Sequence, residues 1–191
     1  MSQPRTVAVV VGSLRKDSVS RKLAAAFAAL TPGLKFNVVE IGDLPHFDQD
    51  LEADPPAQWV RFRSEIAAAD AVLFVTPEFN RSVPGALKNA IDVGSRPYGQ
   101  SVWNGKPGAV ISVSPGAIGG FGANHHLRQS LVFLNVPLLS QEAYVGNAYA
   151  LFDETGELVS EATTDFLRNY GAAFSAWIER IVDHAPAAKA A

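Results

Sequence analysis

The fold follows from one segment of the chain, Val9-Val10-Val11-Gly12-Ser13-Leu14-Arg15-Lys16-Asp17-Ser18-Val19-Ser20. Its β-branched run predicts a buried strand that ends at Gly12, and the alanine-rich residues 21–30 favour a helix after the loop. The first turn of a helix offers free backbone N–H groups and the positive end of the helix dipole, and both attract anions. The stretch therefore predicts a strand, an anion-binding loop and a helix in succession.

The polar side chains of this loop suit a phosphate. Ser13, Ser18 and Ser20 offer hydroxyl donors, and Arg15 offers a planar charged fork. Each contact with the helix dipole contributes only about 0.3–1 kcal/mol at an exposed site, so several donors must converge to hold a ligand. A second interpretation, in which Ser18 or Ser20 only caps the helix, stays open on the loop alone.

Other phosphate-binding loops need glycines that this one lacks. A dinucleotide-binding fingerprint needs glycine where Leu14 and Asp17 stand, and a Walker loop needs glycine and lysine where Asp17 and Ser18 stand. A serine-rich loop after the first strand suits a single terminal monophosphate, as FMN carries in the flavodoxin-like form of the doubly wound fold.

The composition describes an ordinary globular domain. The 191 residues are 48% hydrophobic and 18% charged, with a formal charge of −3, which predicts neither a nucleic-acid nor a membrane partner. The chain has no apolar run long enough for a membrane span and no signal peptide, so the cytoplasm is the default expectation. We expect one domain over residues 1–184 and a frayed tail over residues 185–191.

The side chains offer no redox centre and no metal site. The sequence contains no cysteine, so electrons would have to reside on a non-protein cofactor. Adjacent residues on a helix do not share a face, so His125 and His126 are poor joint ligands. His46 and His184 complete the four histidines, and we expect all of them to be surface or interface residues.

Strand and helix patterns alternate along the chain. Strands are expected at residues 6–11, 35–41, 71–76, 108–114 and 137–139, the second of them at an edge of the sheet because its polarity is mixed. Helices are expected at residues 21–30, 57–69, 86–93 and 124–134, followed by a long final helix after Ser160. This order predicts an α/β fold, with an open parallel sheet and helices on both of its faces.

Two further loops follow predicted strands. Residues 77–85 combine two prolines and a glycine, and residues 115–122 contain four glycines, which implies close backbone approach to a flat ligand or another chain. Loops at the carboxyl ends of central strands line the ligand crevice of a doubly wound sheet. We therefore expect both loops to face the first one, and we expect the long connection over residues 42–56 to be functional or adaptable.

These three loops together resemble the flavodoxin-like NADPH-dependent FMN reductases, which include bacterial quinone, azo and chromate reductases. The segments that carry the resemblance are Gly12-Ser13-Leu14-Arg15 with Ser18, Pro77-Glu78-Phe79-Asn80-Arg81-Ser82-Val83-Pro84-Gly85 with Lys88-Asn89-Ala90-Ile91-Asp92, and residues 114–120. The resemblance implies a three-layer sandwich around a five-stranded parallel sheet of order 2-1-3-4-5. It also implies a homodimer or homotetramer, with residues 84–92 and 121–128 at an interface.

The resemblance also implies a set of FMN-binding residues. The phosphate would be wrapped by Ser13, Arg15, Ser18, Val19 and Ser20. The ribityl chain and one edge of the ring would be held by Pro77, Glu78, Phe79 and Asn80, and the other side of the ring would be bordered by Ser114 and Gly116. The chain departs from the family at Phe79, where tyrosine is common, and at Val93-Gly94, which replaces a position that is often aromatic.

The predicted activity is a two-electron reduction of quinones or other oxidised acceptors, such as chromate, azo compounds or flavins. NADPH or NADH would reduce the flavin and leave before the acceptor binds, and no catalytic side chain is required because hydride passes through FMN. Glu78 as a general base is a weaker interpretation, and Arg81 either meets the second substrate or lies in solvent. The rival function is a flavin-binding electron carrier or regulatory module that acts on protein partners. A serine hydrolase is excluded, because Gly99-Gln100-Ser101-Val102-Trp103 lacks the final glycine of its motif.

Overall fold

The computed structural model describes residues 4–183, so the predicted tail over residues 185–191 and His184 lie outside it. The strands are β1 (Arg5–Val11), β2 (Leu34–Val39), β3 (Ala71–Pro77), β4 (Gly108–Val113) and β5 (Ala143–Val145). The helices are α1 (Val19–Leu30), α2 (Ala57–Ala67), α3 (Gly85–Gly94), α4 (Phe121–Phe133) and α5 (Glu161–Val182), with short 3-10 turns η1 (Gln49–Leu51) and η2 (Ala148–Ala150). Within the described part, no helix combines the length and the apolar character that a bilayer crossing requires.

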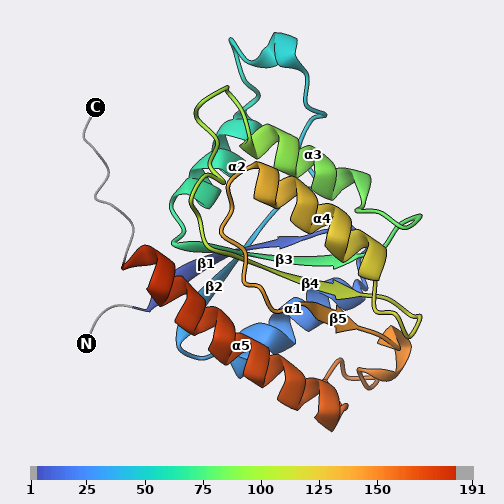
Figure 1. Cartoon of the computed structure of the whole chain (residues 1–191). Coiled ribbons are helices and arrows are strands. Elements are labelled where there is room, and N and C mark those ends of the chain that lie inside the picture. The colour runs from blue at the N-terminus through green and yellow to red at the C-terminus, as the bar shows by residue number, and fades with distance from the viewer. Residues whose placement is uncertain (1–3, 184–191) are drawn as a thin grey trace.

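The five strands form one parallel sheet in the order β2-β1-β3-β4-β5, which confirms the predicted topology. Helices α1 and α5 cover one face of the sheet, and α2, α3 and α4 cover the other (Figure 1). The central strands are apolar throughout because alternate residues of each strand face opposite layers. Val9 joins the core on the α1 and α5 side, for example, whereas its neighbour Val10 joins the core on the other side.

The prediction of the fifth strand was wrong. The strand is Ala143–Val145, which pairs with Ile111–Val113 at the far end of β4. The predicted residues 137–139 lie along the start of β4, where Leu138 forms only an isolated bridge with Gly108. Pro137 has no N–H to donate, although its carbonyl accepts the N–H of Gly108 at 3.1 Å. The chain then leaves β4 and rejoins it at Ala143. The apolar residues 137–139 therefore lie at the correct edge of the sheet, but they do not form the strand.

Several helix ends differ from the expectations by two or three residues. Helix α1 begins at Val19 instead of Arg21, and α4 begins at Phe121 instead of Asn124, whereas α2 ends at Ala67. The predicted cap of the last helix is confirmed, because the Ser160 hydroxyl accepts the N–H of Thr163 at 3.3 Å.

Candidate functional site

The carboxyl ends of β1, β3 and β4 lie side by side at one edge of the sheet. Val11 pairs with Val75, and Pro77 pairs with Val113, so the loops that follow these strands leave the sheet next to one another. Gly12 extends the first of these pairings, since its N–H donates to the carbonyl of Val75 at 2.9 Å. The structure therefore brings together the three segments that the sequence singles out.

Glycines allow these loops to pack closely. A Cβ on Gly12 would lie 2.8 Å from Oγ1 of Thr76, and a Cβ on Gly120 would lie 3.2 Å from Cβ of Ser112 and 3.6 Å from Cβ of Glu78. The first glycine joins the loop after β1 to β3, and the second joins the loop after β4 to both β4 and the loop after β3. Larger residues at either position would push the three loops apart.

The first loop ends in a capped helix with unused donors. The Ser18 hydroxyl accepts the N–H of Arg21 at 3.2 Å, so the capping interpretation is correct for Ser18. The N–H groups of Val19 and Ser20 occupy the first two helical positions and have no intrahelical acceptor. The cap therefore does not use up this terminus, which keeps donors for an anion. The hydroxyl-bearing residues of this loop, Ser13, Ser18 and Ser20, are buried, whereas the charged Arg15 is exposed.

The second loop contains a tight hairpin. Phe79 and Ser82 exchange backbone hydrogen bonds of 2.9 Å each, and the two residues between them have positive φ angles of 51° at Asn80 and 64° at Arg81. Two consecutive left-handed residues define the type of turn that suits the twist of paired strands, although glycine usually supplies this conformation. The hairpin leaves the Phe79 ring half exposed at the edge of the sheet, 54% of its surface being accessible.

Glu78 links the second loop to the start of α4. Its Oε2 accepts the N–H of Ala123 at 3.1 Å, and its Oε1 accepts a hydrogen bond from Nη1 of Arg81 at 3.2 Å. Gly120 stands at the N-cap position of α4 and has no side chain to offer, so Glu78 performs the capping from a distant part of the chain. Two donors already engage this carboxylate, which argues against its interpretation as a free general base.

The third loop is held mainly by contacts within the chain. The Ser114 hydroxyl accepts the N–H of Gly116 at 3.3 Å, and Gly119, at a φ of 65°, lies so close to β5 that a Cβ there would be 2.7 Å from the Val145 nitrogen. Buried Ser112 fixes the same loop by donating its hydroxyl to the Gly119 carbonyl at 2.7 Å. The glycine at position 119 thus allows a close approach to the neighbouring strand, and the approach of this loop to a flat ligand or a second chain stays a prediction.

A titratable cluster lies beside this loop. The Tyr144 hydroxyl lies 2.9 Å from Nε2 of His125 and also donates to the Glu142 carboxylate. Burial, followed by this hydrogen bond to Glu142, raises the pKa of Tyr144 to about 12. Tyr144 therefore stays neutral throughout the physiological range, and His125 lies in a polar surface cluster as expected.

The sequence interpretation missed two residues that shape the surroundings of the site. Asn89 of α3 accepts the N–H of Phe47 at 2.7 Å and donates to the carbonyls of Leu44 and Pro45, so it clamps the start of the long connection. Asn89 stands in one of the matching segments, but nothing in its neighbourhood in the sequence predicts which distant backbone it binds. Trp103 is the second residue, and its indole packs against Gly94, one of the two positions at which the chain is expected to depart from the family.

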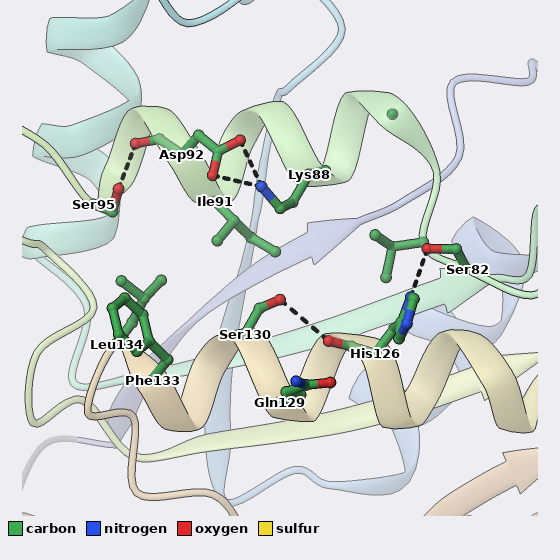
Figure 2. A pocket seen from close by; sticks show the side chains of 12 residues that line it. Ser82, Lys88, Ile91, Asp92, Ser95, His126, Gln129, Ser130, Phe133 and Leu134 are labelled. Carbon is green, nitrogen blue, oxygen red and sulfur yellow. Dashed lines mark hydrogen bonds and ion pairs between the residues drawn. The ribbon is translucent and has the colours of Figure 1, made fainter. Parts of the chain in front are cut away.

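A groove of about 830 Å³ runs between α3 and α4 (Figure 2). At one end the Ser82 hydroxyl lies 2.8 Å from Nδ1 of His126, and on the α3 wall Lys88 pairs with Asp92 at 2.9 Å. At the other end Phe133 is 88% exposed. The predicted interface segment over residues 84–92 contributes several lining residues, whereas the segment over residues 121–128 contributes His126.

Comparisons with known proteins agree on one family. The model of the family described as NADPH-dependent FMN reductase matches residues 5–150. A quinone reductase from Pseudomonas putida is 62% identical over 182 residues, which cover 94% of this chain and 97% of that protein. A 2-hydroxy-1,4-benzoquinone reductase from a Burkholderia species is 48% identical over 90% of this chain and 95% of that protein. The solved structure of FerB, a flavoenzyme NAD(P)H:(acceptor) oxidoreductase from Paracoccus denitrificans, superposes with a TM-score of 0.87 at 46% identity, covering 92% of this chain and 98% of that one.

Proposed function

Because the chain belongs to the NADPH-dependent FMN reductase family, we propose that it is an FMN-dependent oxidoreductase that uses NADPH or NADH to reduce quinones. The observation that carries this proposal is the convergence of three loops at the carboxyl ends of β1, β3 and β4, at a helix terminus with unused donors. Ligands of open parallel sheets bind at such an edge, where the strand order reverses between β1 and β3.

The first loop suits the phosphate of FMN. The N–H groups of Val19 and Ser20 would donate to phosphate oxygens, together with the hydroxyls of Ser13 and Ser18. Arg15 is exposed beside this terminus and would close over the phosphate with its charged fork. This donor set is neutral or positive at every position, which matches a doubly charged monophosphate.

The other two loops would hold the ribityl chain and the ring. Residues 77–80 would lie along one side of the flavin, and Ser114 and Gly116 along the other. Phe79 would offer the ring its flat face but lacks the hydroxyl contact that a tyrosine would make. The hydrogen bonds of Glu78 to α4 and of Ser112 to the third loop would fix the distance between these two walls. The protein thus contributes position and exclusion of water, instead of an acid or a base.

FMN held by these loops would supply the redox chemistry, a transfer of two electrons from the nicotinamide to a quinone, which gains two protons and becomes a hydroquinone. The chain contains no cysteine that could store electrons itself. Since both substrates would use the same ring face, they would bind one after the other. Reduction of chromate, azo compounds or free flavins at this open face stays a prediction.

Steady-state kinetics of the FMN-loaded protein test this function. We expect oxidation of NADPH or NADH only when a quinone such as 1,4-benzoquinone is added, with parallel lines in double-reciprocal plots at varied quinone. An electron carrier would instead need a protein partner to reduce its flavin. Absence of turnover with either nucleotide, in a sample that holds one FMN per chain, would contradict the proposal.

We also propose that the groove between α3 and α4 is the contact between two copies of the chain. Its walls are mixed: Ile91 and Leu134 are apolar, whereas Lys88 and Asp92 carry opposite charges, which suits a self-complementary contact. Phe133 of α4 lines one end of the groove and is exposed, and large apolar side chains that gather at such a surface mark a contact site. A homodimer through this face, or a pair of such dimers, would place the loop after β3 near the boundary.

We propose the cytoplasm as the compartment, where nicotinamide nucleotides are regenerated.

A further inference from the structure

We propose that Arg81 binds the negatively charged group of anionic electron acceptors and thereby favours them over neutral acceptors of the same size. This inference rests on the proposed function and concerns the choice of acceptor. Arg81 lies in the hairpin Phe79–Ser82, which directly follows Glu78 at the edge of the sheet where the three loops converge. A cation at this place would stand at the entrance to the ring without belonging to the phosphate-binding loop.

The backbone at Arg81 is unfavourable for the residue that it carries. Its φ angle is 64°, directly after Asn80 at 51°. Asparagine tolerates this left-handed region because its short polar side chain can hydrogen-bond to nearby backbone, whereas in arginine the crowding of Cβ against the following carbonyl has no such compensation. Glycine would form the same turn without that conflict, so the turn itself does not require arginine. Strained residues of this kind occur preferentially at functional sites, where the side chain has a role.

The hairpin is fixed against α4 from both of its ends. On one side the Glu78 carboxylate binds the N–H of Ala123, and on the other the Ser82 hydroxyl lies 2.8 Å from Nδ1 of His126 (Figure 2). Between them, the Arg81 carbonyl approaches α4 so closely that a Cβ on Gly122 would lie 2.8 Å from it. The backbone of Arg81 therefore has a defined position, at the edge of the sheet where the three loops converge.

Most of the guanidinium remains available to a ligand. The Arg81 side chain is 77% exposed, and within residues 4–183 its hydrogen bonding is limited to the 3.2 Å contact of Nη1 with Glu78. The Glu78 carboxylate also accepts the N–H of Ala123, so its negative charge is not engaged by the arginine alone. The donors on Nε and Nη2 form the planar fork that binds two oxygens of a sulfonate, a carboxylate or a similar oxyanion. The contact with Glu78 orients this fork and need not break when an anion binds.

The test compares two acceptors that share one ring system, 1,4-naphthoquinone and its 2-sulfonate, in the FMN-loaded enzyme with NADPH. Differences in reduction potential between the two acceptors cancel when each variant is compared with the wild type. In Arg81→Gln we expect the ratio of kcat/KM for the sulfonate to kcat/KM for the neutral quinone to fall about tenfold, the effect of one charged hydrogen bond. Lys35→Gln, on the edge strand β2, removes the same charge far from the site and should leave the ratio within twofold of the wild type.

A salt series adds a second readout. The wild-type ratio should decline as ionic strength rises, because an exposed charge pair is screened, whereas the ratio of Arg81→Gln should stay nearly constant. A ratio in Arg81→Gln within twofold of the wild type, or an equal salt dependence in both proteins, would overturn the inference. A wild-type enzyme that reduces neither quinone would contradict the proposed function itself, so the two failures are distinguishable.

Discussion

Gly94 and Trp103 occupy each other's space: a Cβ on Gly94 would lie 2.6 Å from three atoms of the Trp103 indole. The indole is fully buried and donates its Nε1–H to the carbonyl of Ile91 at 3.0 Å, so it cannot move outward without losing that hydrogen bond. Phe62 and Phe74 pack against the same indole, with ring centroids 5.9 Å and 5.6 Å away. Trp103, on the connection after α3, therefore joins an aromatic cluster of this layer, and its indole fills the space beside Gly94.

We expect Gly94→Ala to lower the free energy of unfolding by about 1–3 kcal/mol, because overpacking must displace the buried indole. Alanine would otherwise favour the helix, so a loss of stability is specific to this contact. Urea unfolding followed by tryptophan fluorescence measures the change. Gly33→Ala is the control, since a Cβ there meets nothing within 4 Å, and it should leave stability unchanged or slightly raised. Equal stabilities of the two variants would contradict the packing account.

Asn89→Ala should cost about 2–3 kcal/mol of stability, because it leaves the Phe47 N–H and the Leu44 carbonyl without their partner, while the Pro45 carbonyl keeps only the Trp59 indole N–H. Hydrogen exchange at the Phe47 amide should accelerate more than exchange in β3, since the long connection would open locally. Asn37→Ala, at an exposed position of β2, serves as the control. Unchanged protection of the Phe47 amide in Asn89→Ala would show that the connection is held by other contacts.

The stability of the protein should fall as the pH rises from about 10 to 12 through the titration of Tyr170. Burial raises the pKa of this tyrosine to about 12 in the folded state, while the unfolded value stays near 10. A raised pKa means that the folded state holds its proton longer, so the stabilisation is fully present below pH 10 and is lost as the pH approaches 12.

Tyr170→Phe isolates this effect. At pH 8 the variant should be about 1 kcal/mol less stable than the wild type, because the hydroxyl no longer donates to the Val110 carbonyl at 3.1 Å. The difference in stability between the two proteins should shrink above pH 10, because only the wild type carries a buried phenol at position 170 whose ionisation favours the unfolded state. Denaturant midpoints of both proteins between pH 8 and pH 11.5 measure it, and a constant difference across this range would contradict the prediction.

Arg15→Ala should weaken FMN binding by ~1.5–3 kcal/mol, the contribution of a charged hydrogen bond to the phosphate. Riboflavin, which lacks the phosphate, should bind the variant and the wild type equally. The neighbouring Lys16→Ala removes the same charge without the planar fork and should weaken FMN binding by less than about 1 kcal/mol. Fluorescence titration of the flavin gives all of these affinities. Equal losses in the two variants would indicate a general charge effect instead of a direct contact.

Phe133→Asp should convert the proposed dimer into monomers, because it places a charge on the apolar end of the groove between α3 and α4. Sedimentation velocity of the two proteins at several concentrations measures the assembly state. Val159→Asp, at another exposed apolar position away from this groove, should leave assembly unchanged. A dimer that persists in Phe133→Asp would place the interface elsewhere.

Local patterns in the sequence were sufficient to predict the layered fold. Apolar runs such as Val7–Val11 and Ala71–Val75 have no polar residue that could face water, so they required a sheet covered on both faces. The β5 strand was missed because an edge strand of three residues has too short a pattern, and Pro137–Leu139 carried a stronger apolar signal beside it.

The candidate site was predictable in part. The positions of its loops follow from topology, because parallel strands end at one edge. The contacts between the loops do not follow from topology, because they join residues that are distant in sequence. Nothing near Glu78 indicates that its carboxylate caps α4, and nothing near Gly119 indicates that its neighbour is β5. Such pairings depend on how the loops pack in three dimensions, which a single sequence does not reveal.

The central claim is that the loops after β1, β3 and β4 together hold FMN by its phosphate and its ring. Titration of wild-type protein, freed of flavin, with FMN and with riboflavin distinguishes binding by the phosphate from binding by the ring alone. We predict one FMN per chain and an affinity for riboflavin at least about 100-fold weaker, because several charged hydrogen bonds to the phosphate are lost. Failure to bind FMN, or equal affinities for the two flavins, would contradict the account.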